Sequence, residues 1–223
     1  MAIVIDEFLL KRIVQGATLP ILIYMSTLLG RKWNNSKNEE GKRSPIRLLI
    51  FLQIFCWSLS GIFSFFLNII YGEISWFYSV NPVSIALVST IMMGITLIGY
   101  MYNNKMVMGS GWYFYGGILF YELATRTGTA MQLQFVVVMG GNILFLIVYF
   151  YQGIKFKDDK ILGLAIFFVF PFFSWAQSRH IILYLILNIG IAVYGTIYAT
   201  GKLKFFREYN KQKMVAEIIQ EVE

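Results

Sequence analysis

The sequence contains seven apolar stretches that are each long enough to cross a lipid bilayer, and these restrict the fold more than any other feature. A bilayer core is spanned by about 20 apolar helical residues, with a usual range of about 17–25. Of the 223 residues 57% are hydrophobic and 14% are charged, whereas soluble domains have about 25% charged residues. The stretches cover residues 13–30, 46–71, 82–102, 108–125, 131–152, 161–177 and 181–200. We therefore expect an all-α, multi-pass protein of a cell membrane, with one transmembrane domain over residues 1–204.

Lysine and arginine fall mainly on one side when the seven stretches cross the membrane in alternating directions. With the amino terminus outside, all but four of the 19 Lys and Arg residues lie on the inner side. The four on the outer side are Lys11, Arg12, Arg126 and Arg179. Inner segments of membrane proteins are enriched in basic residues, so the sequence predicts an outer amino terminus and an inner carboxyl terminus.

This topology also accounts for the net charge of +7, because anionic lipids line the inner leaflet. The lipid bilayer is thus the expected partner, and nucleic acid is not. Residues 205–223 differ from the rest, since apolar side chains from Met214 to Val222 recur at helical spacing beside charged ones. We expect this segment to be a cytoplasmic amphipathic helical tail along the inner membrane face.

Similarities between the first three and the last three stretches indicate an internal repeat. The first stretch aligns with the fifth from Gly16 and Gly140 onward, and the second and sixth each hold a tryptophan. Both halves would begin on the same side, so the plan is a parallel three-plus-one-plus-three repeat, a known transporter layout, with the fourth stretch as linker. The alternative is chance similarity, because apolar segments draw on the same few residue types.

One pattern in the second stretch is that of a known family. Pro20 lies in the first stretch, Pro45 begins the second, and residues 53–61 read QIFCWSLSG, a tryptophan followed four residues later by glycine. In these features the chain resembles the SWEET and PQ-loop family of small sugar and solute transporters.

The resemblance implies site residues and a function. Asn81 and Asn188 are similar in placement to the paired asparagines that face the sugar in that family, and Trp57 and Trp175 to the tryptophans beside them. It implies a carrier that moves an uncharged, sugar-like solute through a core between stretches 1–3 and 5–7.

A second family offers a competing interpretation. Residues 167–175 read FFVFPFFSW, which resembles the sixth span of microbial rhodopsins, and residues 187–192 read LNIGIA, which resembles their seventh. Asn188 and Ala192 occupy the positions of the aspartate and the retinal lysine. Since no lysine lies in the middle of any stretch, this resemblance implies an opsin-like receptor or sensor without covalent retinal, and we expect no cofactor.

The remaining candidates are polar residues inside apolar stretches, which are costly in a membrane unless they are paired. Asn188 and Asn142 could contact a small polar solute or form interhelical hydrogen bonds. Asn81, followed by Pro82, could equally cap the start of a helix.

Glu122 lies one helical turn before Arg126, a spacing at which two side chains can meet. This pair could couple transport to protons, with the acid neutralised by burial, or form an ion pair near the outer interface.

Catalytic and metal sites are not expected. Cys56 and His180 are the only cysteine and the only histidine, which leaves no thiol or imidazole cluster and no internal disulfide. A third interpretation is therefore a structural subunit of a membrane complex, in a homo-oligomer or with a partner subunit.

Overall fold

The computed structural model describes residues 7–37, 41–71, 82–125, 129–176, 181–206 and 209. These residues form seven α-helices and no sheet, which confirms the predicted all-α class. In chain order the helices are α1 (Glu7–Asn34), α2 (Pro45–Tyr71), α3 (Pro82–Met101), α4 (Lys105–Thr125), α5 (Thr129–Lys155), α6 (Asp159–Ala176) and α7 (Ile181–Thr200).

Five of these helices have the character of membrane spans. Within the described residues, α1, α2, α3, α5 and α7 contain segments long and apolar enough to cross a membrane. The helix α6 is the shortest, with 18 residues, and begins with the charged pair Asp159 and Lys160. The protein thus has the helical, apolar character of a membrane-embedded protein, as the sequence predicts.

The helices match the predicted stretches closely in the middle, and most of them extend beyond the stretches at one or both ends. The largest extension is in α1, which begins at Glu7 and ends at Asn34 around the predicted range 13–30. The helix α5 likewise ends at Lys155. Apolar runs mark only the part of a helix that hydrocarbon requires, whereas the helix itself continues until a turn satisfies its backbone.

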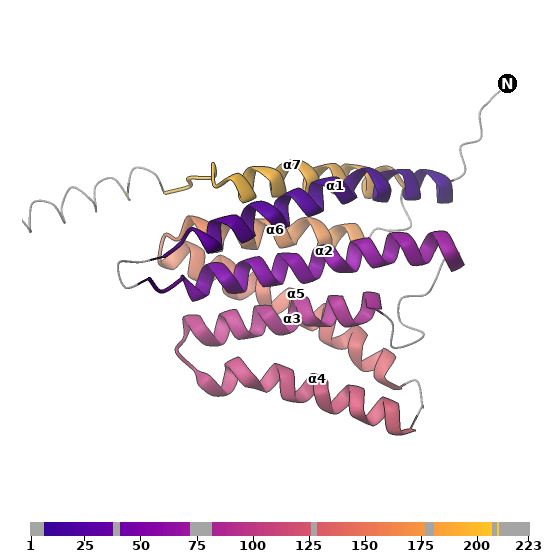
Figure 1. Ribbon diagram of the computed structural model, residues 1–223, viewed down its shortest axis with the longest axis horizontal. Helices are drawn as coiled ribbons and strands as arrows, with labels where there is room; N and C mark the ends of the chain where they lie inside the picture. Colours follow the sequence, from indigo (N-terminus) through magenta and orange to yellow (C-terminus); the bar gives the residue numbers. More distant parts are fainter. Residues whose placement is uncertain are drawn as a thin grey trace, which may run out of the picture.

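Six helices form a closed ring, and α4 packs outside it (Figure 1). Around the ring α1 contacts α2, α2 contacts α3, α3 contacts α5, α5 contacts α6, α6 contacts α7, and α7 contacts α1. The helix α4 packs against α3 and α5. Consecutive helices run in opposite directions, so the α1–α2, α3–α4 and α5–α6 turns and the end of α7 lie together at one end of the bundle (Figure 1).

A tight turn connects α3 to α4. The backbone N–H of Asn104 donates to the Gly99 carbonyl at 2.8 Å, after Asn103 has taken a left-handed conformation with φ 50°. The side chain of Asn104 then accepts hydrogen bonds from the first amides of α4, at 3.1 Å from Met106 and 3.2 Å from Val107. This is a helix C-cap followed at once by an N-cap.

The α5–α6 turn repeats this geometry with different residues. Lys157 has φ 51°, and the N–H of Asp158 donates to the Gly153 carbonyl at 3.0 Å. The Asp158 carboxylate accepts from the amides of Lys160 at 2.8 Å and Ile161 at 3.3 Å. The α3–α4 and α5–α6 hairpins therefore have turns of the same geometry.

Basic side chains gather at the end that holds these turns, which we call the basic end. The described Lys and Arg residues at this end are Arg31, Lys32, Lys37, Lys42, Arg43, Arg47, Lys105, Lys155, Lys157, Lys160, Lys202 and Lys204. Lys11 and Arg12 lie near the start of α1, at the opposite end. The helical arrangement thus separates the charges as the sequence predicts, while the direction of insertion stays a prediction.

Aromatic rings fill the centre of the ring of helices. Phe145 and Tyr149 of α5 stack with centroids 5.4 Å apart, and Phe167 and Phe168 of α6 meet edge to face at 5.5 Å. All four side chains have an exposed fraction of 1% or less. The centre is therefore a close-packed core. It also contains two polar groups, the amide of Gln53 and the hydroxyl of Tyr149.

Candidate functional site

A buried polar contact joins three helices at the centre of the bundle. Gln53 of α2 and Tyr149 of α5 both have an exposed fraction of 0%. The Tyr149 hydroxyl lies 3.1 Å from Gln53 Oε1 and 3.3 Å from the Gly94 carbonyl oxygen of α3. Since a hydroxyl has one hydrogen, these two acceptors share it. We call Gln53, Gly94 and Tyr149 the central polar contact.

Glycine at position 94 makes this contact possible. A Cβ atom on Gly94 would lie 2.6 Å from Gln53 Nε2 and would overlap the ring of Phe145. Only a residue without a side chain therefore lets α3 approach α2 and α5 closely enough for its carbonyl to meet Tyr149.

The amide of Gln53 is incompletely satisfied. Among the described residues, Gln53 Nε2 is buried and has no hydrogen-bond partner. Exchanging the amide nitrogen and oxygen would let the nitrogen donate to Tyr149 and would leave the oxygen unpaired instead. Because a buried unpaired polar group costs about 1–3 kcal/mol, its presence needs an explanation. The contact can offer one further hydrogen bond to a polar group.

Trp57, a predicted site residue, lies next to this contact. It follows Gln53 by one turn on α2, and its indole meets the Phe167 ring edge to face with centroids 5.2 Å apart. Residues four apart lie on one helix face. The amide of Gln53 and the indole of Trp57 thus project from α2 on the same side.

The two predicted mid-helix asparagines each donate a hydrogen bond to a carbonyl of their own helix. Asn142 Nδ2 donates to the Val138 carbonyl at 2.9 Å, and Asn188 Nδ2 donates to the Tyr184 carbonyl at 2.8 Å. The Tyr184 hydroxyl lies close to the side chains of both Asn188 and Gln15 of α1. Asn188 is therefore half-buried close to the contact between α7 and α1.

The structure does not describe the other predicted site residues in full. Trp175 lies next to the last residue of α6 and Glu122 in the last turn of α4, and their side chains are outside the described part. Asn81 and Arg126 lie outside the described residues. The proposed asparagine pair and the Glu122–Arg126 pair stay predictions.

The central polar contact was not predicted, although one of its residues, Gln53, stands out in the sequence. Gln53 and Asn68 are the only amides in the second apolar stretch, and a buried amide in such a stretch is a site hypothesis in itself. Tyr149 has no such signal, because it lies among other aromatic residues 96 positions away. Only the packing of α2, α3 and α5 brings the two together.

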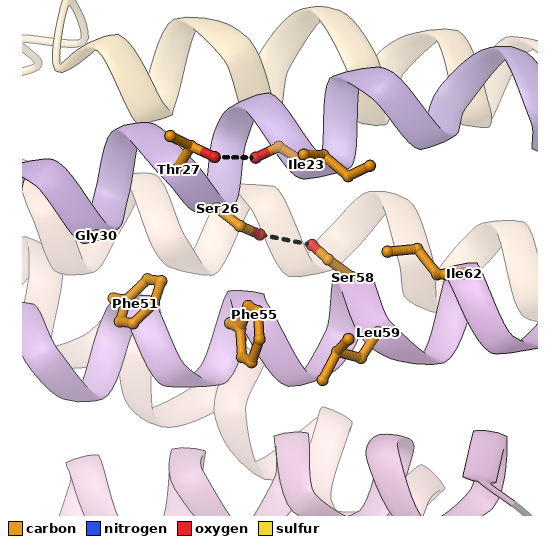
Figure 2. Close-up of a pocket in the computed structure, with 9 residues that line it drawn as sticks. All are labelled: Ile23, Ser26, Thr27, Gly30, Phe51, Phe55, Ser58, Leu59 and Ile62. Atoms are coloured by element: carbon orange, nitrogen blue, oxygen red, sulfur yellow. Dashed lines mark hydrogen bonds between the residues drawn. The ribbon is translucent and has the colours of Figure 1, made fainter.

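A second feature is a groove between α1 and α2, with a volume of about 230 Å³ (Figure 2). The exposed side chains of Ile23 and Phe55 show that it opens away from the centre of the bundle. At its floor the Ser26 hydroxyl donates to the Ser58 oxygen at 3.1 Å. The groove is lined by Ile23, Ser26, Thr27, Gly30, Phe51, Phe55, Ser58, Leu59 and Ile62.

Within the described residues, no three His, Cys, Asp or Glu side chains lie close enough together to hold a metal ion. The candidate site is therefore defined by neutral polar groups and aromatic rings. No family model, no curated protein and no solved structure matches the chain.

Proposed function

We propose that the protein is a carrier for a small, uncharged polar solute in a cell membrane. The observation that favours this most is the buried amide nitrogen of Gln53 at the centre of the bundle, which has no hydrogen-bond partner among the described residues. The carrier crosses the membrane seven times, with the amino terminus outside and the basic end at the inner side.

The arrangement of the ring supports two equivalent halves. If α1 is matched to α5, α2 to α6 and α3 to α7, each pair of neighbouring helices in the ring corresponds to another neighbouring pair. The α3–α5 contact becomes the α7–α1 contact, and α4 lies outside as a linker. Transporters built from parallel repeats open by moving one half against the other, and these two contacts are where the halves would separate.

Both contacts between the halves use the same neutral chemistry. Beside the α3–α5 contact, the Tyr149 hydroxyl binds the Gln53 amide. At the α1–α7 contact, the Tyr184 hydroxyl lies close to the Gln15 amide. A hydrogen bond between side chains in a membrane contributes only about 0.6 kcal/mol on average, so such contacts can break and re-form during a transport cycle.

The chemistry of the central polar contact favours a neutral solute. Amide and hydroxyl groups can exchange their mutual hydrogen bonds for bonds to a hydroxylated or amide solute. The nearby Trp57 ring offers an apolar face for the carbon skeleton of a sugar-like molecule. A charged solute would instead need a compensating charge at this depth.

The test is uptake by proteoliposomes of a panel of radiolabelled sugars, polyols and small amides. We expect flux of at least one of these solutes, and a loss of this flux in Gln53→Leu. The matched control is Gln152→Leu, which removes another buried glutamine, near the basic end of α5. No flux of any solute through the unchanged protein, or equal flux through Gln53→Leu, would reject the proposal.

A structural subunit of a membrane assembly is the second candidate, and the dense packing of the core favours it. Phe145, Phe167 and Phe168 fill the space where a permanently open path would run. Purification in a mild detergent from its native membrane separates the two functions. Stoichiometric co-purification with one partner, without solute flux, would support the subunit.

A further inference from the structure

We propose that the groove between α1 and α2 binds an anionic phospholipid, with an acyl chain along the groove and the phosphate among the cations at its basic end. This site is separate from the central polar contact and does not depend on the carrier function.

The length of the groove fits one leaflet of a bilayer. Its wall on α2 runs from Phe51, near the basic end, to Ile62 (Figure 2). At about 1.5 Å per residue this distance is about 16 Å, close to half of a hydrocarbon core of about 30 Å. A lipid whose head lies at the basic end would therefore place its chain along the whole wall.

The groove is apolar because its hydroxyls are turned to other acceptors. Ser26 donates to Ser58 at 3.1 Å, and Ser58 donates to the Ile54 carbonyl at 2.8 Å. Thr27 donates to the Ile23 carbonyl at 2.8 Å. With these donors used, the surface that faces outward consists of methyl groups and the rings of Phe51 and Phe55, which suits hydrocarbon and offers little to a polar solute.

A stack of aromatic rings continues the groove to the membrane interface. The ring centroids of Phe55 and Phe51 are 5.6 Å apart. The Phe51 ring is nearly parallel to the Trp33 ring, with centroids 6.2 Å apart. The guanidinium of Arg43 lies 5.0 Å from the centroid of the Trp33 ring. Tryptophan is typical of the headgroup level, so this stack marks where the chain of a lipid ends and its head begins.

Further cations lie on the two helices that form the groove. Arg47 Nη1 donates to the Lys32 carbonyl at 3.5 Å, which holds the start of α2 against the end of α1. Arg47 is one turn before Phe51, and Lys32 is two residues after Gly30. Arg43 and Arg47 therefore place two positive charges at the basic end of the groove, whereas Lys32 Nζ lies beside Gly201, which follows α7. An anionic headgroup would complement the two guanidinium groups.

The proposal is tested with the full chain in mild detergent, by native mass spectrometry and titration with phosphatidylglycerol or with phosphatidylcholine of the same acyl chains. We expect tighter binding of phosphatidylglycerol. The double variant Arg43→Gln/Arg47→Gln should weaken it by at least about tenfold, since both guanidinium charges that would attract the phosphate are lost. Equal affinity for the two lipids in the unchanged protein would overturn the proposal.

Filling the groove tests the acyl chain. Thr27 is exposed, so Thr27→Phe places a ring in the groove without disturbing the core, and it should reduce binding of both lipids. The control is Ile147→Phe, which enlarges an exposed apolar side chain on α5 and should leave binding unchanged. Thermal unfolding confirms that both variants are folded.

Two other outcomes would also contradict the proposal. Displacement of the lipid by glycerol 3-phosphate at the same concentration would mean that a free phosphate is sufficient. A dimer that Thr27→Phe dissociates would mean that the groove receives a helix of a second copy.

Discussion

The central polar contact and the α1–α2 groove differ in whether their polar atoms have hydrogen-bond partners. At the centre, three helices close around Gln53 and leave one amide atom without a partner among the described residues. In the groove, each hydroxyl has an acceptor, and apolar side chains line the open space. The unpaired polar atom in a closed space is the reason for proposing a polar solute there. The satisfied polar atoms beneath an open apolar surface are the reason for proposing a lipid in the groove.

The space around a glycine also differs between the central polar contact and the groove. A Cβ atom on Gly94 would meet both the Gln53 amide and the Phe145 ring, each held in the core. A Cβ atom on Gly30 would lie 3.3 Å from the edge of the Phe51 ring, which borders open space. The centre is therefore intolerant of added atoms, whereas the groove can adjust to them.

The largest effect is expected from Gly94→Ala. The added methyl group has no space, and overpacking of a core costs about 1–3 kcal/mol. Gly117→Ala is the matched control, since a Cβ atom there would meet nothing within 4 Å. Thermal unfolding in one detergent should show a clear loss of stability for Gly94→Ala only. Equal melting temperatures would mean that α3 is not held closely against α2 and α5.

A smaller effect is expected from Tyr149→Phe, which leaves the Gln53 and Gly94 oxygens without their donor. We expect a loss of about 1 kcal/mol in the free energy of unfolding, the usual net contribution of one hydrogen bond. Gln53→Leu should be close to neutral, because it removes a polar group that is already incompletely paired. The double variant Gln53→Leu/Tyr149→Phe should be more stable than Tyr149→Phe alone, and a double-mutant cycle measures this coupling. Additive effects would argue against a direct contact.

The smallest effect is expected in the groove. Ser26→Ala removes one hydrogen bond to Ser58, which retains its own bond to the Ile54 carbonyl. A loss of about 0.6 kcal/mol is expected in a membrane environment. Measured in nanodiscs with and without phosphatidylglycerol, this difference should be the same, since the serine pair is at the floor of the groove, beneath the proposed lipid. A loss several times larger would mean that the serine pair contributes at least as much to stability as the central polar contact.

Much of the fold could be predicted from particular residues, but little of the site could. Pro45 and Pro82 begin α2 and α3 at or next to the predicted positions, and Thr200 ends α7 as predicted. Asn142 and Asn188 were selected because they are amides in apolar stretches, and both bond to carbonyls of their own helices. The sequence marks such residues as polar and costly, but it does not reveal which way each side chain points.

Within the described residues, the sequence by itself determined the number, the order and the approximate ends of the helices, together with the separation of basic residues to one end. The predicted helical tail over residues 205–223 lies largely outside the described residues. The sequence could determine the helices because a chain in hydrocarbon must satisfy its backbone hydrogen bonds within each helix, so that every apolar stretch becomes a helix independently of the others. Only the tertiary structure decided that α4 lies outside the ring, that Gln53 meets Tyr149, and that a groove separates α1 from α2. Side chains that face lipid and side chains that face other helices are equally apolar. Hydrophobicity therefore does not distinguish the faces of these helices, and close packing around residues such as Gly94 selects the neighbours.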